Sequence, residues 1–97
     1  MAMHNPPHPG EFIQSVYLGP NNLSCREVAD KLGVAASTLH RVLNGSSGIS
    51  ADMALRLSKS IGRTPESWLA MQDNYDLWQA KQTADLRDVV KVRLIAA

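Results

Sequence analysis

The chain has 97 residues, a length that suits one domain and is short for two. Hydrophobic residues make up 44% of it and Cys25 is the only cysteine, so the composition excludes a disordered chain and an internal disulfide. No apolar run approaches the ~18 residues of a membrane span, and the first residues lack the pattern of a signal peptide. We therefore expect a cytoplasmic protein without membrane segments.

The formal charge of +1 is unevenly distributed. Residues 24–63 contain six basic and three acidic side chains, whereas residues 1–23 and 64–97 each carry a formal charge of −1. The six basic side chains are Arg26, Lys31, Arg41, Arg56, Lys59 and Arg63. A basic middle fits a localised phosphate-binding face, although a solvated helical surface gives the same pattern.

The first part of the chain is predicted to be an arm and a short helix. Residues 1–9 contain three prolines, which favour an extended N-terminal arm. Over residues 10–18, four large apolar side chains recur at helical spacing. These side chains are Phe12, Ile13, Val16 and Tyr17. Pro20 and the two asparagines after it end the helix.

The clearest helix start in the sequence lies at Ser24. Ser24 and Glu27 have the spacing of a capping box, in which each side chain accepts the backbone N–H of the other residue. The helix then runs to Leu32, and Gly33 ends it in the left-handed conformation that suits glycine. A third helix over residues 36–43 follows after only two or three residues.

Helix, glycine turn and second helix within residues 24–43 form the layout of a helix-turn-helix motif, whose second helix enters the major groove of DNA. Arg41 can make a bidentate contact to guanine there. The expected DNA-binding residues are Arg26, Ala36, Ser37, Thr38, His40, Arg41 and Asn44. The alternative is that these are ordinary polar residues on a solvated helix.

Two further helices are predicted after the Asn44-Gly45 stop. Ser50 caps one over residues 51–61, and the pair Thr64-Pro65 opens another that reaches about residue 82. The last helix repeats large side chains close to every 3.5 residues, with more aromatic surface than one small core needs. We expect core and dimer contacts from Trp68, Met71, Tyr75 and Trp78.

Residues 83–97 form a tail beyond the helical domain of residues 10–82. In the tail, Leu86, Val89, Val90 and Arg93 fit helical spacing, whereas Val90, Val92 and Leu94 alternate as in a strand. Four of the seven residues 89–95 are β-branched, which favours an extended segment such as a strand. Because a solitary strand is unstable, it would need a partner.

Three stretches of this chain resemble the HigA family of antitoxins within the lambda-repressor-like, XRE-type group. They are HPGEFI, LSCREVADKLGVAASTLHRVLNG and ISADMALRLSKSIGRTPESWLAMQDNYDLWQA, which together cover most of residues 8–80. The resemblance implies an all-α, five-helix fold, a homodimer and binding to a palindromic operator in double-stranded DNA. It also implies pairing with a HigB-type toxin, an mRNA-cleaving enzyme that the protein neutralises while it regulates its own operon. The alternative is a stand-alone helix-turn-helix repressor without a toxin partner.

Three positions depart from the pattern of that group. Ala35 precedes the third helix where a capping oxygen is frequent, and Ala36 stands where a longer polar side chain often reads a base. Ser46 and Ser47 follow the third helix where a basic residue is frequent. These departures bear on the affinity and the operator sequence, not on the fold.

Catalysis and metal binding are not expected. Cys25 lies in the first turn of a helix, which can lower the pKa of a thiol, but no motif places a histidine beside it. Pro6 and Pro7 separate His4 from His8 and forbid a helical pair of ligands, and no cysteine or carboxylate joins them. We expect no enzyme activity, no metal and no cofactor.

Overall fold

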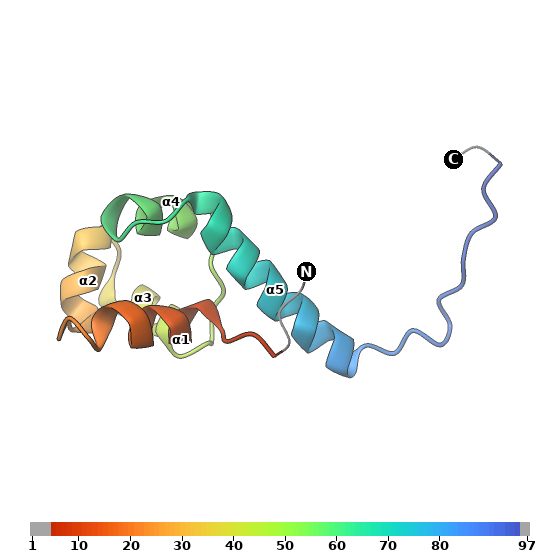
Figure 1. Cartoon of the computed structure of the whole chain (residues 1–97), viewed down its shortest axis with the longest axis horizontal. Coiled ribbons are helices and arrows are strands. Elements are labelled where there is room, and N and C mark those ends of the chain that lie inside the picture. The colour runs from red at the N-terminus through yellow and green to blue at the C-terminus, as the bar shows by residue number, and fades with distance from the viewer. Residues whose placement is uncertain (1–4, 96–97) are drawn as a thin grey trace.

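The computed structural model describes residues 5–95, and in these residues it contains helices and no strand (Figure 1). The elements in chain order are α1 (Pro9–Ile13) with the π-helical turn η1 (Gln14–Leu18), α2 (Cys25–Leu32), α3 (Ala36–Leu43), α4 (Ala51–Ser60) and α5 (Pro65–Thr83). The expected all-α, five-helix architecture is confirmed. None of the helices in this range is both long and apolar enough to cross a bilayer.

The helix boundaries follow the capping signals. The Ser24 hydroxyl accepts the Glu27 N–H at 3.1 Å and the Glu27 carboxylate accepts the Ser24 N–H at 3.1 Å, so the capping box forms. Gly33 ends α2 with φ at +74°. Ser50 and Thr64 cap α4 and α5 through their hydroxyl oxygens. Each cap satisfies backbone groups that a helix end leaves open.

The helix predicted over residues 10–18 begins one residue earlier and changes its pitch at Gln14. The Gly19 N–H donates to the Gln14 carbonyl at 2.8 Å, which closes a five-residue repeat in place of the α-helical four. This widening rotates the side chains that follow. Val16, expected to face the core, is 43% exposed, whereas Leu18 is buried.

Trp68 lies at the centre of the core. Its side chain is 0% exposed and its indole N–H donates to the Gly62 carbonyl at 2.9 Å. The other buried hydrophobic side chains are Ile13, Leu18, Val28, Ala29, Leu32, Leu39, Val42, Ile49, Met53, Ala54 and Leu57. Trp68 therefore makes the core contact that the sequence predicted, and a dimer contact from this residue stays a prediction.

The segment before α1 is not a free arm. Residues 1–4 of the predicted arm lie outside the described range, but Pro6, His8 and Pro9 are buried. The His8 ring accepts the Gly10 N–H at 2.9 Å as the cap of α1 and meets the Tyr75 ring edge-on at 4.9 Å. Proline has little backbone freedom to lose, so ordering this segment costs little conformational entropy.

Gly10 brings α1 against the backbone of α3. A Cβ atom on Gly10 would overlap the Val42 carbonyl group and crowd the Leu43 Cα. Pro9 occupies the first helical position and Glu11 the first turn, where an acidic side chain complements the helix dipole. The start of the HPGEFI stretch therefore positions α3, the helix that follows the turn at Gly33, through the contact at Gly10.

The second half of α5 extends beyond the rest of the molecule, and the tail continues from its end (Figure 1). Residues 84–95 form neither helix nor strand. Their large apolar side chains are exposed in the single chain: Leu86, Val89, Val90, Val92, Leu94 and Ile95. The possible strand does not form here, as expected for a strand without a partner.

Candidate nucleic-acid interface

The start of α2 lies beside the start of α3. The Cys25 thiol donates to the Ala36 carbonyl at 3.6 Å, which joins the two first turns. Arg26, the next residue of α2, is exposed, so its guanidinium can approach a DNA strand bound along α3. Cys25 thus makes a packing contact in the helix-turn-helix.

The outer face of α3 carries the polar residues that the sequence singled out. Ser37, His40 and Arg41 are exposed, and Ala36 and Thr38 are half-buried. Leu39 and Val42 point into the core and hold the helix in place. The structure therefore brings the predicted base-reading residues together on one accessible face of a rigid helix.

The first turn of α3 has no side-chain cap among the described residues. Ala35 is the cap residue, with extended backbone angles of −66° and 146°, and its methyl group offers no acceptor. The departure noted at this position is confirmed. The first amides of α3 are left to water or to an incoming phosphate, which helix N-termini bind well.

Asn44 is held by the loop that follows α3. Its side-chain oxygen accepts the Ser46 N–H at 2.9 Å, and the Ser47 N–H donates to the Arg41 carbonyl at 3.0 Å. Asn44 thus shapes the loop, and its exposed position keeps it a candidate for a phosphate contact.

Gln72, a residue that the sequence reasoning missed, fixes this loop to α5. Its side-chain oxygen accepts the Ile49 N–H at 2.9 Å, and its amide nitrogen donates to Asp76 at 2.9 Å. Gln72 is buried although it is polar, and its hydrogen bonds satisfy it. No local pattern marks Gln72, because its partner Ile49 lies 23 residues away.

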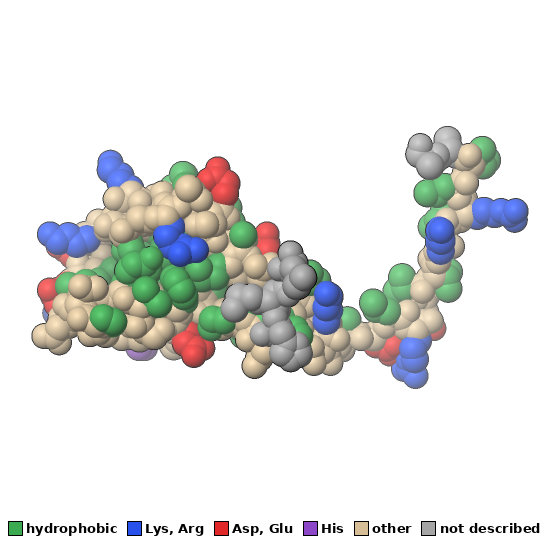
Figure 2. All heavy atoms as spheres, in the orientation of Figure 1, with side chains coloured by type: hydrophobic (Ala, Val, Ile, Leu, Met, Phe, Trp, Pro, Cys, Tyr) green, Lys and Arg blue, Asp and Glu red, His purple; other side chains and the backbone are tan. Residues whose placement is uncertain are grey.

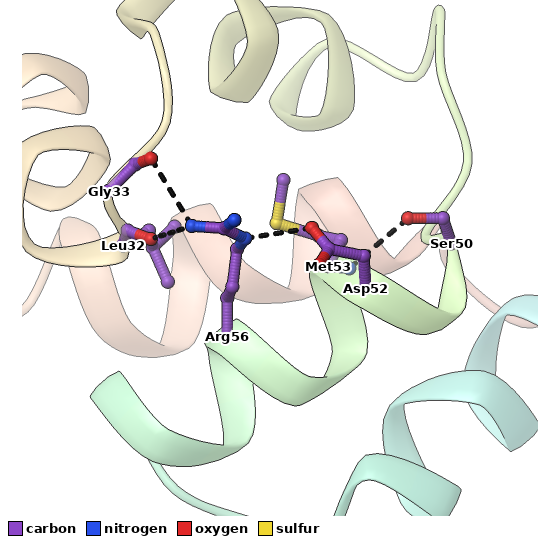
Figure 3. A network of polar contacts seen from close by, with 6 residues as sticks. All are labelled: Leu32, Gly33, Ser50, Asp52, Met53 and Arg56. Atoms are coloured by element: carbon purple, nitrogen blue, oxygen red, sulfur yellow. Dashed lines mark hydrogen bonds and ion pairs between the residues drawn. The ribbon is translucent and has the colours of Figure 1, made fainter.

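Two of the six basic residues in the middle of the chain have structural roles. The Arg56 guanidinium donates to the carbonyls of Leu32 and Gly33, at 2.9 and 3.2 Å, and pairs with Asp52 at 2.7 Å (Figure 3). Arg56 thereby joins α4 to the end of α2. Arg56 is therefore no longer a candidate for a phosphate contact.

The second of these residues is Arg63. Its guanidinium lies over the rings of Phe12 and Trp68, at 5.3 and 5.7 Å from their centroids. This is the geometry of a cation–π contact. Arg26, Lys31, Arg41 and Lys59 remain as phosphate candidates, all of them exposed.

Burial lowers the pKa of His8, against the opposing effect of Asp76 and Glu11. Since its folded pKa lies below the unfolded value, the unfolded chain binds the proton first, and stability is lost as the pH falls below about 6.5. We expect His8→Asn, which keeps a capping oxygen, to lose stability less steeply than the wild type between pH 7.5 and 5.5. Urea unfolding across this range measures the difference.

His40→Asn is the matched control for His8→Asn, because His40 is exposed on α3 and caps nothing. It should keep the wild-type pH dependence of stability. Equal curves for the His8 and His40 variants would show that the buried histidine does not couple stability to pH.

Among residues 5–95, no three histidine, cysteine, aspartate or glutamate side chains come close enough to hold a metal ion. The exposed polar side chains of α3 are Ser37, His40 and Arg41, and Arg41 carries a positive charge. These side chains can donate hydrogen bonds to nucleic acid.

Comparison with known proteins agrees with this geometry. The helix-turn-helix family model matches residues 17–69. The HTH-type transcriptional regulator YddM of Escherichia coli K12 is 40% identical over 89% of this chain and 90% of its own length. Antitoxin HigA-1 of Vibrio cholerae is 32% identical over 74% of this chain and 68% of its own. The solved structure of antitoxin GraA in complex with its operator superposes with a TM-score of 0.83 at 39% identity, covering 99% and 97% of the two chains.

Proposed function

This chain belongs to the helix-turn-helix family and, within it, to the HigA antitoxins, and we propose that it is a DNA-binding antitoxin that represses its own operon and neutralises an mRNA-cleaving toxin. It acts by binding, without catalysis, in the cytoplasm. As a homodimer it binds the two half-sites of a palindromic operator, about 34 Å apart.

The observation that carries the DNA-binding part is the exposed polar face of α3. Arg41 lies on this face with Ser37 and His40, and the opposite face of α3 packs against the core. An arginine in the major groove can donate two hydrogen bonds to guanine O6 and N7. The exposure of Arg26 at the start of α2 supports a phosphate contact from this residue.

Arg41→Ala should weaken operator binding by roughly 1–3 kcal/mol and relax the preference at one base pair. Arg26→Ala is the matched control, because it should weaken binding to all sequences alike and lower the salt slope by about 1. Selection from a randomised site with both variants measures preference, and salt titrations measure the slope. Unchanged preference in Arg41→Ala would show that α3 is not the reading helix.

The toxin-binding part of the proposal rests on membership of the antitoxin family. Its test uses the same variant, Arg41→Ala. If a small neighbouring reading frame encodes the toxin, co-expression of this protein should restore the growth of cells that express that reading frame. The two proteins should also co-purify as a complex. Arg41→Ala should keep this rescue, because reading DNA and covering a toxin use different surfaces. Absence of both rescue and complex would favour the second candidate, a stand-alone repressor like the transcriptional regulators among the relatives.

Of the residues expected at the dimer interface, three keep accessible surface on α5. Met71, Tyr75 and Trp78 are half-buried, and Tyr75 already contacts His8. The exposed Leu77 lies in the same projecting half of the helix. We propose that two copies pack along this part of α5, which holds the two α3 helices at the operator spacing.

A further inference from the structure

Gln72 is a polar side chain that α5 buries beneath the loop between α3 and α4. It is 7% exposed, and its amide oxygen accepts the Ile49 N–H at 2.9 Å while its amide nitrogen donates to the Asp76 carboxylate at 2.9 Å. A Cβ atom on Gly48 would lie 3.1–3.3 Å from the atoms of this amide, so the loop packs directly against it. Because a buried amide without partners costs free energy, this placement depends on both hydrogen bonds.

Asp76 determines which end of the Gln72 amide faces the loop. A carboxylate accepts hydrogen bonds and does not donate them, so it favours the NH2 end of the amide. The oxygen end then faces the Ile49 N–H, which can only donate. With the amide turned round, two acceptors would meet at Asp76 and two donors at Ile49. The two partners of Gln72 therefore select one arrangement of the loop.

The loop is joined at its other end to the helix that carries Arg41. The Ser47 N–H donates to the Arg41 carbonyl at 3.0 Å, and the Ser46 N–H donates to the Asn44 side chain at 2.9 Å. Both hydrogen bonds are local, whereas the hydrogen bond to Gln72 connects the loop to a residue 23 positions away. A shift at Gln72 should therefore move the loop relative to the last turn of α3.

Residues 44–50, which form this loop, contain no basic side chain. Figure 2 shows basic side chains at the end of the molecule formed by α2 and α4, on the far half of α5 and on the tail. The exposed side chains of the loop offer neutral donors, such as the amide of Asn44 and the hydroxyl of Ser46. A lysine on its flexible stem attracts a phosphate from many directions. A neutral donor needs a distance of about 3 Å and a favourable angle, so its contact depends on where the loop is held.

We propose that Gln72 is a positioning residue for DNA binding, which holds the loop where Asn44 and Ser46 donate to phosphates beside the base that Arg41 reads. This inference rests on the DNA-binding part of the proposed function. Gln72 acts through the loop and does not touch DNA, and Asp76 acts through Gln72. In this way α5 contributes to operator affinity from behind the loop.

Gln72→Met tests this role in the full-length chain, because it keeps an unbranched side chain and removes both hydrogen bonds without a change of charge. The probe is the DNA site that the wild type selects from a randomised pool. We expect the affinity for this site to fall by about tenfold at a temperature where circular dichroism shows the variant to be folded. Thr64→Ala is the matched control, because it removes the hydroxyl that caps the same helix and should keep the wild-type affinity.

A reciprocal exchange of the two polar groups supplies the rescue. Gln72→Glu alone brings two carboxylates together and should weaken binding. Gln72→Glu combined with Asp76→Asn places the new carboxylate between the Ile49 N–H and an amide NH2, and it keeps the net charge of the chain. This pair should recover the wild-type affinity. Asn74→Asp, which adds a negative charge at an exposed position of α5, should bind as the wild type does.

Ser46→Ala tests the contact that Gln72 is proposed to position, and as an exposed substitution it should leave the fold unchanged. It should weaken binding severalfold. Because Gln72 acts through the loop, Gln72→Met should weaken binding less in the Ser46→Ala background than in the wild type. If Gln72→Met does not fold, Ser46→Ala and the reciprocal exchange still test the proposal.

Four results would overturn the role of Gln72. They are wild-type affinity in Gln72→Met, wild-type affinity in Ser46→Ala, equal losses of affinity in Gln72→Met and Thr64→Ala, and a reciprocal exchange that restores stability in urea but not affinity. If the wild type selects no DNA site, the DNA-binding part of the proposed function fails. If it selects a site and these variants bind that site normally, only the positioning role fails.

Discussion

Replacing Gly10 by alanine is expected to lower the free energy of unfolding by about 3 kcal/mol, at the upper end of what overpacking costs. The new methyl group would overlap the Val42 carbonyl, which belongs to the backbone of α3 and cannot rotate away. Relief requires α1 to move off α3. Urea unfolding followed by circular dichroism measures the loss.

Gly19→Ala is the matched control for Gly10→Ala. Gly19 has a helical φ of −56°, is exposed, and a Cβ atom there would meet only the Gln14 carbonyl oxygen, at 3.3 Å. The change in stability should stay within about 0.5 kcal/mol. Equal losses in the two variants would show that the contact between α1 and α3 does not set the cost.

The same substitution should also disturb DNA binding, because α1 supports α3 from behind. If α3 shifts, the base contacts that we propose for Arg41 and its neighbours on α3 are disturbed. Operator affinity of Gly10→Ala, measured at a temperature where the variant is folded, should therefore fall, while Gly19→Ala keeps the wild-type value.

The helix starts and stops were predictable from sequence because the interactions that set them are local. The capping box joins residues three apart, Ser24 and Glu27, and Gly33 needs only its own backbone freedom. The exposed polar face of α3 was predictable for the same reason, since helical spacing along the chain separates the buried Leu39 and Val42 from the polar positions. Its role in reading bases remains a prediction.

The contacts that position the site were not predictable, because they join residues distant in sequence. Gly10 of α1 packs against the Val42 carbonyl of α3, and Gln72 of α5 holds the loop that follows α3. The sequence placed His8 in an extended arm, whereas the structure shows that it caps α1 and contacts Tyr75. Spacing patterns reveal which face of a helix is buried, but not which distant backbone will lie against it.

Arg56 shows how far a basic residue can depart from the role that its charge suggests. Arg56→Met keeps the aliphatic stem and removes the donors to Leu32 and Gly33. Hydrogen bonds from a charged group contribute roughly 1.5–3 kcal/mol, so we expect a loss of about 2 kcal/mol in the free energy of unfolding. Asp52→Asn, which weakens only an exposed ion pair, should cost under about 1 kcal/mol.

DNA binding separates this structural role of Arg56 from a phosphate contact. A residue that neutralises a phosphate contributes about 0.9 to the slope of log affinity against log salt concentration. Arg56→Met should leave this slope unchanged while the protein loses stability, whereas Arg26→Ala should lower the slope and leave stability nearly unchanged. A lower slope in Arg56→Met would instead place Arg56 on the DNA. Because Arg56 is already committed to the end of α2 and to Asp52, the unchanged slope is the expected result (Figure 3).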